Sequence, residues 1–176
     1  MAEHDILMSG PLVRATFAGL KTETRRLDMR WLKAKKGDIL RVKETWAPGV
    51  AGLDGVKPSE MPTDTPIIYR ADCEPEADPG VVKRWRPSIF MCRWMVRLRL
   101  RMTADAYVER LHDITEDAAR REGVLRKFKV GRKGYWCLDH TTAFRVVWES
   151  INGRASWDSN PDVVVLPFAR VEADDE

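Results

Sequence analysis

Alternation of apolar and basic side chains marks the clearest strand in the chain. Between 96 and 102 apolar residues alternate with three arginines, Arg97, Arg99 and Arg101. This period of two predicts a half-buried strand with an arginine row on its second face. A continuous apolar run at 163–166 predicts a buried strand within 162–171. We expect both strands to belong to one curved sheet.

A helical period is clearest near the C-terminal end. Four apolar residues recur at i, i+3, i+4 and i+7: Phe144, Val147, Trp148 and Ile151. This stripe predicts an amphipathic helix over 139–152 that begins at Asp139 or Thr141 and ends at Asn152-Gly153. We expect Phe144 and Trp148 to pack on the sheet.

Capping residues and short apolar stretches predict the remaining elements. Ser9 and Pro11 open a helix that Gly19 ends, and Thr115 and Gly123 delimit another. Further short strands are expected at 5–8, 39–46 and 67–71. The strands lack regular helical crossovers, which favours an α+β class with a small mixed β-barrel and flanking helices.

Three stretches interrupt this pattern. Residues 47–65 and 72–94 are rich in proline and glycine and predict long loops, and 126–137 predicts a basic hairpin or loop. We interpret 1–176 as one domain with insertions at about 47–94 and 125–137. Long loops in a compact domain are often functional.

Composition excludes several classes of protein. With 44% hydrophobic and 32% charged residues among 176, the chain is an ordinary globular one. It has neither a membrane-length apolar run nor a signal peptide. The three cysteines are widely spaced, which is typical of a reducing cytoplasm, and the three histidines are scattered. We therefore expect a cytoplasmic protein with no metal site, no cofactor and no membrane partner.

Charge is distributed unevenly around a net +3. Residues 83–104 contain seven basic residues and no acidic one, and the chain has seven tryptophans. Arginine contacts phosphates and indole stacks on bases, so the combination indicates nucleotides or RNA as partners. The alternative is a set of solvated basic faces with ordinary core tryptophans.

The segment 19–26 carries candidate chemistry. Lys21 and Thr24 are three residues apart, and Arg25 and Arg26 follow them. Neighbouring positive charge disfavours a protonated lysine and lowers its pKa. A lysine so lowered can take the proton of the threonine hydroxyl and make it a nucleophile. The alternative is a solvated basic turn capped by Thr22.

Glu122 is placed against its local electrostatics. It lies at the C-terminal end of the helix predicted after Thr115, where a carboxylate opposes the helix dipole. Residues placed in this way are often functional. The alternative is a surface glutamate paired with an arginine.

Several aromatic residues lie in or beside the predicted loops. Trp46, Trp85 and Trp94 are candidates for stacking a base, and Glu44 at a strand end is a further acid that can face a pocket. The alternative for each tryptophan is a hydrophobic plug beneath a loop.

Several motifs occur in the order found in a known family. They are Gly19-x-Lys21-Thr22-x-Thr24-x-Arg26, Lys36-Gly37-Asp38-x-Leu40-x-Val42 and Ile114-Thr115-Glu116-x-x-Ala119-x-x-Glu122-Gly123-Val124. Together they resemble the ASCH domain, and Trp85-x-Pro87-Ser88-Ile89-x-Met91-x-Arg93-Trp94 is similar to a stretch in its longer phage and prophage members.

The resemblance implies a PUA-like fold that handles RNA or modified nucleosides. Short bacterial ASCH proteins include an amidohydrolase that cleaves N(4)-acetylcytidine to cytidine and acetate. By this likeness Lys21 is the base, Thr24 the nucleophile and Glu122 the proton donor of a metal-independent reaction.

We therefore expect a pocket that binds a modified cytosine nucleoside or RNA. Its predicted substrate-binding residues are Arg26, Glu44, Trp46, Trp85 and Arg93, and the arginine row at 97, 99 and 101 is the predicted RNA-binding face. The leading hypothesis is hydrolysis of an acyl group from the exocyclic amine of a cytosine nucleoside. The alternatives are an RNA-binding module without catalysis and a ribonuclease that uses the same cleft.

Overall fold

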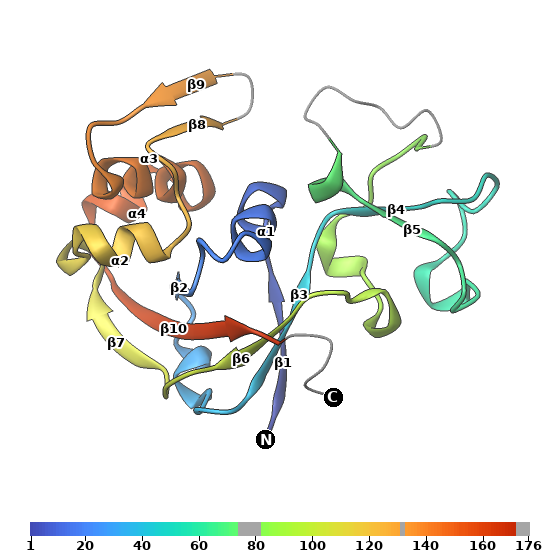
Figure 1. Ribbon diagram of the computed structural model, residues 1–176, viewed down its shortest axis with the longest axis horizontal. Coiled ribbons are helices and arrows are strands. Elements are labelled where there is room, and N and C mark those ends of the chain that lie inside the picture. Colours follow the sequence, from blue (N-terminus) through green and yellow to red (C-terminus); the bar gives the residue numbers. More distant parts are fainter. Residues whose placement is uncertain (74–81, 131–132, 172–176) are drawn as a thin grey trace.

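A curled sheet of six strands forms the centre of the molecule (Figure 1). The computed structural model describes residues 1–73, 82–130 and 133–171. The strands run in the order β1 (Glu3–Leu7), β3 (Ile39–Lys43), β6 (Arg99–Met102), β10 (Asp162–Arg170) and β2 (Glu23–Arg26), and β7 (Tyr107–Arg110) also pairs with β10. The β1–β3 pair is parallel and the other pairs are antiparallel, so the sheet is mixed.

Strand β10 connects three parts of the sheet. Its first half pairs with β7 and β2, and its last residues pair with β6. Residues 163–166 are completely buried, as the apolar run predicts. The alternation before 102 is also confirmed, because Leu98, Leu100 and Met102 are buried whereas Arg101 is exposed. The strand itself begins at Arg99 rather than at 96.

The helices lie in two places. Helix α1 (Gly10–Phe17) lies within the curl of the sheet, and α2 (Glu116–Arg121), α3 (His140–Asn152) and α4 (Arg154–Asp158) gather at one end (Figure 1). Two of the predicted caps form, since Thr115 Oγ1 accepts from Ala118 N and Asp139 accepts from Thr142 N, whereas the Ser9 side chain makes no capping hydrogen bond to α1. None of the helices in the described ranges is long and apolar enough to cross a membrane.

Two hydrophobic cores follow from this arrangement. Inside the curl, Val13 of α1 packs with sheet residues that include Leu100 and Leu166. Beneath α2–α4, Phe144 and Trp148 pack in a second core that includes Val163 of β10. This confirms the predicted helix and its packing on the sheet. The last member of the predicted stripe, Ile151, is 60% exposed because the helix extends past the core in its final turn.

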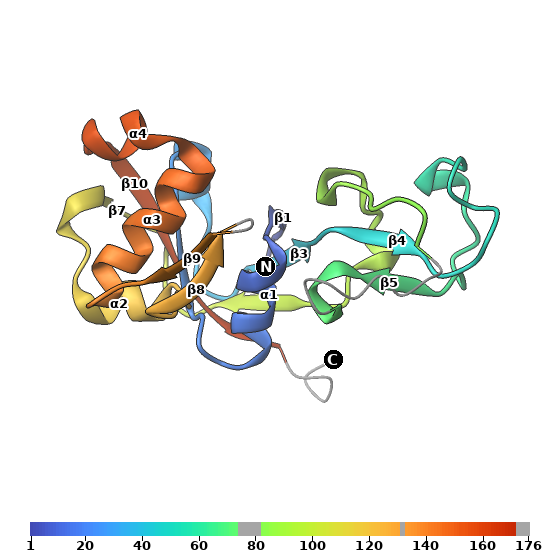
Figure 2. The ribbon, with the colours of Figure 1, turned by 90° about the horizontal axis from the view of Figure 1, so that it is seen from above.

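The insertion at about 47–94 forms a lobe with its own core. It contains the two-stranded sheet of β4 (Trp46–Pro48) and β5 (Ile67–Tyr69), and it projects from the side of the sheet opposite α2–α4 (Figure 2). Short 3₁₀ helices occur here and elsewhere, at Met29–Lys33, Pro58–Glu60, Arg70–Asp72, Ser88–Phe90, Arg93–Met95 and Leu111–Asp113. The part of the predicted 72–94 loop at 74–81 lies outside the described residues.

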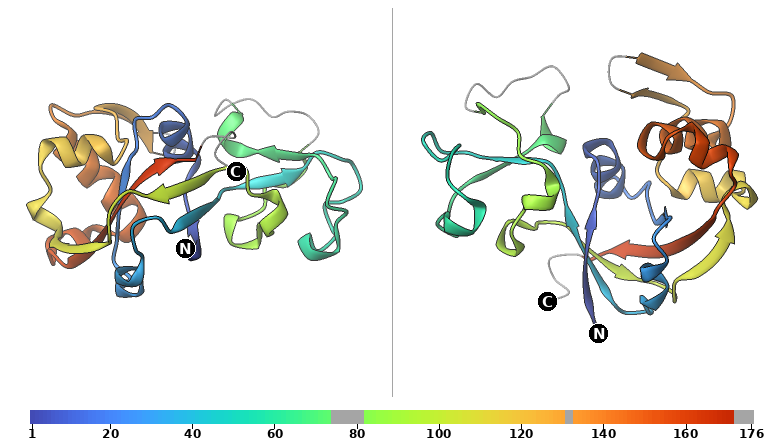
Figure 3. Two further views of the ribbon diagram at one scale, coloured as in Figure 1. Left: turned by 60° about the horizontal axis from the view of Figure 1, so that its bottom comes forward. Right: turned by 180° about the vertical axis from the view of Figure 1, so that it is seen from behind.

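The basic insertion forms the predicted hairpin. Strand β8 (Lys127–Val130) pairs with β9 (Lys133–Trp136) beside α3, and residues 131–132 lie outside the described ranges. Views from below and from behind show this hairpin and the β4–β5 lobe at opposite ends of the curled sheet (Figure 3). The α+β class and the curled, barrel-like sheet with flanking helices are thus confirmed.

Candidate functional site

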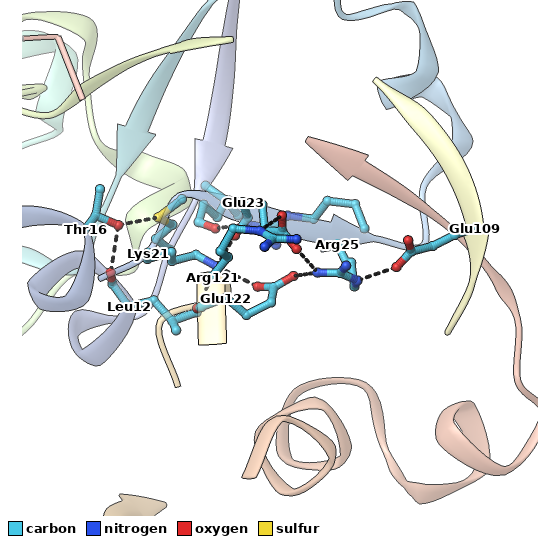
Figure 4. Close-up of polar contacts among 11 residues, drawn as sticks. Leu12, Thr16, Lys21, Glu23, Arg25, Glu109, Arg121 and Glu122 are labelled. Carbon is cyan, nitrogen blue, oxygen red and sulfur yellow. Dashed lines mark hydrogen bonds and ion pairs between the residues drawn. The ribbon is translucent and has the colours of Figure 1, made fainter. Parts of the chain in front are cut away.

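Lys21 is buried where the end of α1 meets the end of α2. It forms an isolated β-bridge with Glu122, which caps α2. The Lys21 amine donates to the Glu122 carboxylate at 2.6 Å, and to the backbone oxygens of Glu122 at 3.0 Å and Glu23 at 2.8 Å (Figure 4). A protonated amine has three hydrogens, so all of them have acceptors here.

Gly123 makes this close approach possible. Its φ of +76° ends α2 in the left-handed region, as the sequence predicts. The glycine has a second function that the sequence does not reveal. A Cβ at this position would lie 2.5 Å from Lys21 Cβ and 2.9 Å from Ala15 Cβ, so only glycine lets these segments pack together.

The Glu122 carboxylate lies between Lys21 and Arg25 (Figure 4). Arg25 donates to Glu122 at 3.1 Å, to Glu23 at 2.8 Å and to Glu109 at 2.7 Å. Arg121 donates to the other oxygen of Glu23 at 2.7 Å. We call this set the charge cluster: Lys21, Glu23, Arg25, Glu109, Arg121 and Glu122. Its three bases and three acids have balanced formal charges.

Burial is the main cause of the shifted pKa of Lys21. Loss of solvent lowers this pKa from 10.5, and the charges of Arg26 and Arg25 lower it further, whereas Glu122 raises it. The predicted direction is confirmed, but crowding by arginines is the smaller cause. The alternative of a solvated basic turn is wrong, because Lys21, Thr24 and Arg25 are all buried.

Glu122 occupies the predicted position at the end of its helix. It is 4% exposed, so the alternative of a surface glutamate is wrong. Two cations from the preceding segment, Lys21 and Arg25, neutralise it. The misfit with the helix dipole is thus compensated by residues about a hundred positions away in sequence.

Thr24 faces the inside of the curled sheet. It lies opposite Leu166 on β10, a residue of the core around α1. Among the described residues, no hydrogen bond joins its hydroxyl to Lys21. The amine instead contacts the carbonyl of Glu23, which belongs to the peptide that precedes Thr24.

The Thr24 hydroxyl makes no hydrogen bond within the described ranges, although the residue is only 4% exposed. Arg26 Nε and Trp46 Nε1 are also buried without a hydrogen-bond partner in the described part of the chain. Arg26 lies on the same face two residues later and donates to the carbonyl of Leu7 at 2.8 Å.

Glu44 holds the lobe to the sheet. It is 1% exposed at the end of β3, and Arg97 donates to both of its oxygens, at 2.9 and 3.1 Å. Arg97 also binds Asp72 and lies 3.8 Å from the Tyr69 ring centroid. Burial raises the pKa of Glu44, and the charge of Arg97 opposes that shift.

The predicted aromatic residues of the pocket belong to the lobe. Trp46 is completely buried in a core with Met61, Met91 and Met95, which matches a hydrophobic plug and leaves no open face for a base. Trp85 lies under Arg70, with 4.9 Å between the guanidinium and the ring centroid.

The predicted arginine contacts are largely taken by acids within the chain. Arg93 and Arg99 both pair with Glu3 of β1, and Arg97 pairs with Glu44 and Asp72. Arg101 is exposed on β6. The structure therefore brings Lys21 and Glu122 together, but it places Glu44, Trp46, Trp85 and Arg93 in the lobe or against β1.

Sequence reasoning missed three members of the charge cluster, Glu23, Glu109 and Arg121. No strand is predicted over 23–26 from the sequence. In the observed β2, the two-residue spacing of Glu23 and Arg25 places opposite charges on one face. Within the described ranges, no group of three or more histidine, cysteine or acidic side chains is arranged to hold a metal ion. Comparisons with models of known families, with curated proteins and with solved structures found no match.

Proposed function

We propose that this chain is a PUA-like, ASCH-type hydrolase that removes an acyl group from the exocyclic amine of a cytosine nucleoside. The observation that carries the proposal is the 2.6 Å contact between Lys21 Nζ and Glu122. These residues are distant in sequence, and the motif resemblance pairs them as base and proton donor. The contact supports that pairing.

A proton transfer within the pair prepares both groups. Because burial lowers the pKa of Lys21, its proton can pass to Glu122 and leave a neutral amine beside a carboxylic acid. The amine takes the Thr24 hydroxyl proton, and a bond forms between Thr24 Oγ1 and the acyl carbon. The bond from the acyl carbon to the exocyclic nitrogen then breaks, and the nitrogen receives the Glu122 proton. Water hydrolyses the acyl-threonine ester to complete the cycle.

This mechanism requires one rearrangement. Lys21 Nζ must exchange its bond to the Glu23 carbonyl for one to Thr24 Oγ1. The carbonyl belongs to the peptide before Thr24, so the amine already lies beside the backbone of its target. A hydroxyl without a hydrogen-bond partner is consistent with a nucleophile that is engaged when substrate binds.

A second candidate function is RNA binding without catalysis. It is favoured because every hydrogen of the protonated Lys21 amine already has an acceptor. An amine with three acceptors is well placed as a structural cation. Such a protein would use the charge cluster to hold β2 against α2, and it would release no product.

Hydrolysis of N(4)-acetylcytidine separates the two candidates. We expect the purified full chain to release cytidine, measured by chromatography against a protein-free blank. Thr24→Ala should reduce the rate by at least about a thousandfold, whereas Thr24→Ser should retain activity because it keeps a hydroxyl. Thr22→Ala is the matched control and should resemble the wild type. Equal rates for the wild type and Thr24→Ala, or no release by the wild type, would reject the hydrolase.

A further inference from the structure

The β8–β9 hairpin concentrates positive charge. Residues 126–138 contain five basic residues and no acidic one: Arg126, Lys127, Lys129, Arg132 and Lys133. Such a segment attracts a polyanion over the range of the Debye length.

The hairpin also exposes an indole. Trp136 is 78% exposed, which is unusual for a side chain with so much apolar area. The strand register places Lys127 directly opposite Trp136, and the Lys127 amine lies 5.5 Å from the ring centroid. The cation therefore lies over one side of the indole ring, and the indole remains largely exposed on this face of the hairpin.

The neighbouring residues hold this face outward. Tyr135 is partly buried and packs against the core beneath α3, and Cys137 is buried and donates from its backbone to Arg126 O at 2.8 Å. Because successive strand residues point to opposite faces, anchoring of Tyr135 and Cys137 turns Trp136 toward solvent. The fold therefore fixes the exposure of Trp136 by anchoring the residue on each side of it.

Lys127 differs from the arginines in and before β6. Arg93, Arg97 and Arg99 each pair with a carboxylate. Lys127, by contrast, is exposed and has no carboxylate partner in the described part of the chain.

We infer that the exposed face of the hairpin binds single-stranded nucleic acid. A base stacks on Trp136, and Lys127, which lies on the same face, contacts an adjacent phosphate. Charge complementarity selects the polyanion, and the open indole selects a strand whose bases are unpaired. This surface lies outside the charge cluster and goes beyond the proposed hydrolase activity, since no reaction at Thr24 is required for binding.

Fluorescence anisotropy of a labelled oligouridylate of about 12 nucleotides tests the inference. We expect the full chain to bind it, and Trp136→Ala to weaken binding by about tenfold or more, with Trp136→Phe retaining part of the affinity. Lys127→Ala should reduce the slope of log affinity against log salt by about 0.7, the value expected when one phosphate is no longer neutralised. Lys35→Ala, which removes another exposed lysine, is the matched control and should leave the slope unchanged.

Three results would overturn the inference. They are failure of the wild type to bind at low salt, unchanged binding by Trp136→Ala, and equal affinity for a duplex of the same length. Binding to anionic lipid vesicles without binding to the oligonucleotide would assign the face to membranes instead. Circular dichroism of each variant excludes unfolding as the cause. Because Thr24→Ala retains the hairpin, it should bind like the wild type whether or not the chain is a hydrolase.

Discussion

The charge cluster and the β8–β9 hairpin are both rich in basic residues, yet the fold treats them in opposite ways. In the cluster, Lys21 and Arg25 lie within 3.1 Å of carboxylates and are buried. On the hairpin, Lys127 is exposed and lies beside an indole. The acids that the fold brings near a cation, rather than the local density of cations, therefore decide whether that cation stabilises the protein or is available to a ligand.

Removal of Glu122 should produce the largest loss of stability. Glu122→Ala leaves Lys21 and Arg25 buried without the carboxylate that they share, so we expect a decrease of about 3–5 kcal/mol in the free energy of unfolding. Lys127→Ala on the hairpin should change it by about 0.5 kcal/mol or less. Urea denaturation of both variants measures the difference. Similar losses for the two variants would remove the distinction between the regions.

Two tryptophans, one buried and one exposed, extend the same comparison. Trp148 is 5% exposed in the core beneath α2–α4, and Trp136 is 78% exposed on the hairpin. We expect Trp148→Ala to cost about 3–5 kcal/mol. Trp136→Ala should change stability by about 0.5 kcal/mol or less, which makes it a clean probe of binding. Thermal and urea denaturation test both, and a marginal effect of Trp148→Ala would contradict its assignment to the core.

Substitutions at two glycines distinguish the cost of overpacking from the cost of backbone strain. Gly123 and Gly19 have similar φ values of +76° and +71°, but only the Cβ at 123 would collide with Lys21. We expect Gly19→Ala to cost about 1–2 kcal/mol from backbone strain alone. Gly123→Ala should cost about 1–3 kcal/mol more because it also overpacks the junction. Urea denaturation measures both costs, and equal values for the two variants would show that Lys21 does not need this close approach.

Much of the fold follows from local patterns in the sequence. The alternation before Met102, the buried run of β10 and the stripe of α3 each depend on neighbours in the chain, so the sequence predicts them. The core of the lobe was not predicted, because Trp46 meets Met61, Met91 and Met95 only after the insertion folds back on itself.

Less of the candidate site than of the fold could be predicted from the sequence. Lys21 and Glu122 stand out because each conflicts with its local electrostatics. Glu109 carries no such signal, since its contact with Arg25 depends on the pairing of β10 with both β2 and β7. The role of Gly123 as a packing contact of Lys21 likewise requires the three-dimensional arrangement.

The smallest expected effect is a shift in the pH profile of hydrolysis. The reactive state needs one proton shared by Lys21 and Glu122, so the rate should fall at high pH as the pair loses that proton to solvent. Arg26 lowers the pKa of Lys21, so Arg26→Gln should move this falling limb to higher pH. Arg154→Gln, which removes an exposed arginine of α4, should leave it in place. The profile of kcat against pH measures the shift, and a limb that does not move would contradict the assignment of Lys21 as the base.

Mass spectrometry of the acyl-enzyme tests the central proposal most directly. The full chain is mixed with N(4)-acetylcytidine, quenched with acid during turnover and digested into peptides. The proposed mechanism predicts one acetyl group on Thr24, and no acetylated peptide from Thr24→Ala. Cytidine release at the wild-type rate by Thr24→Ala, or an acetyl group on another residue during turnover, would contradict it.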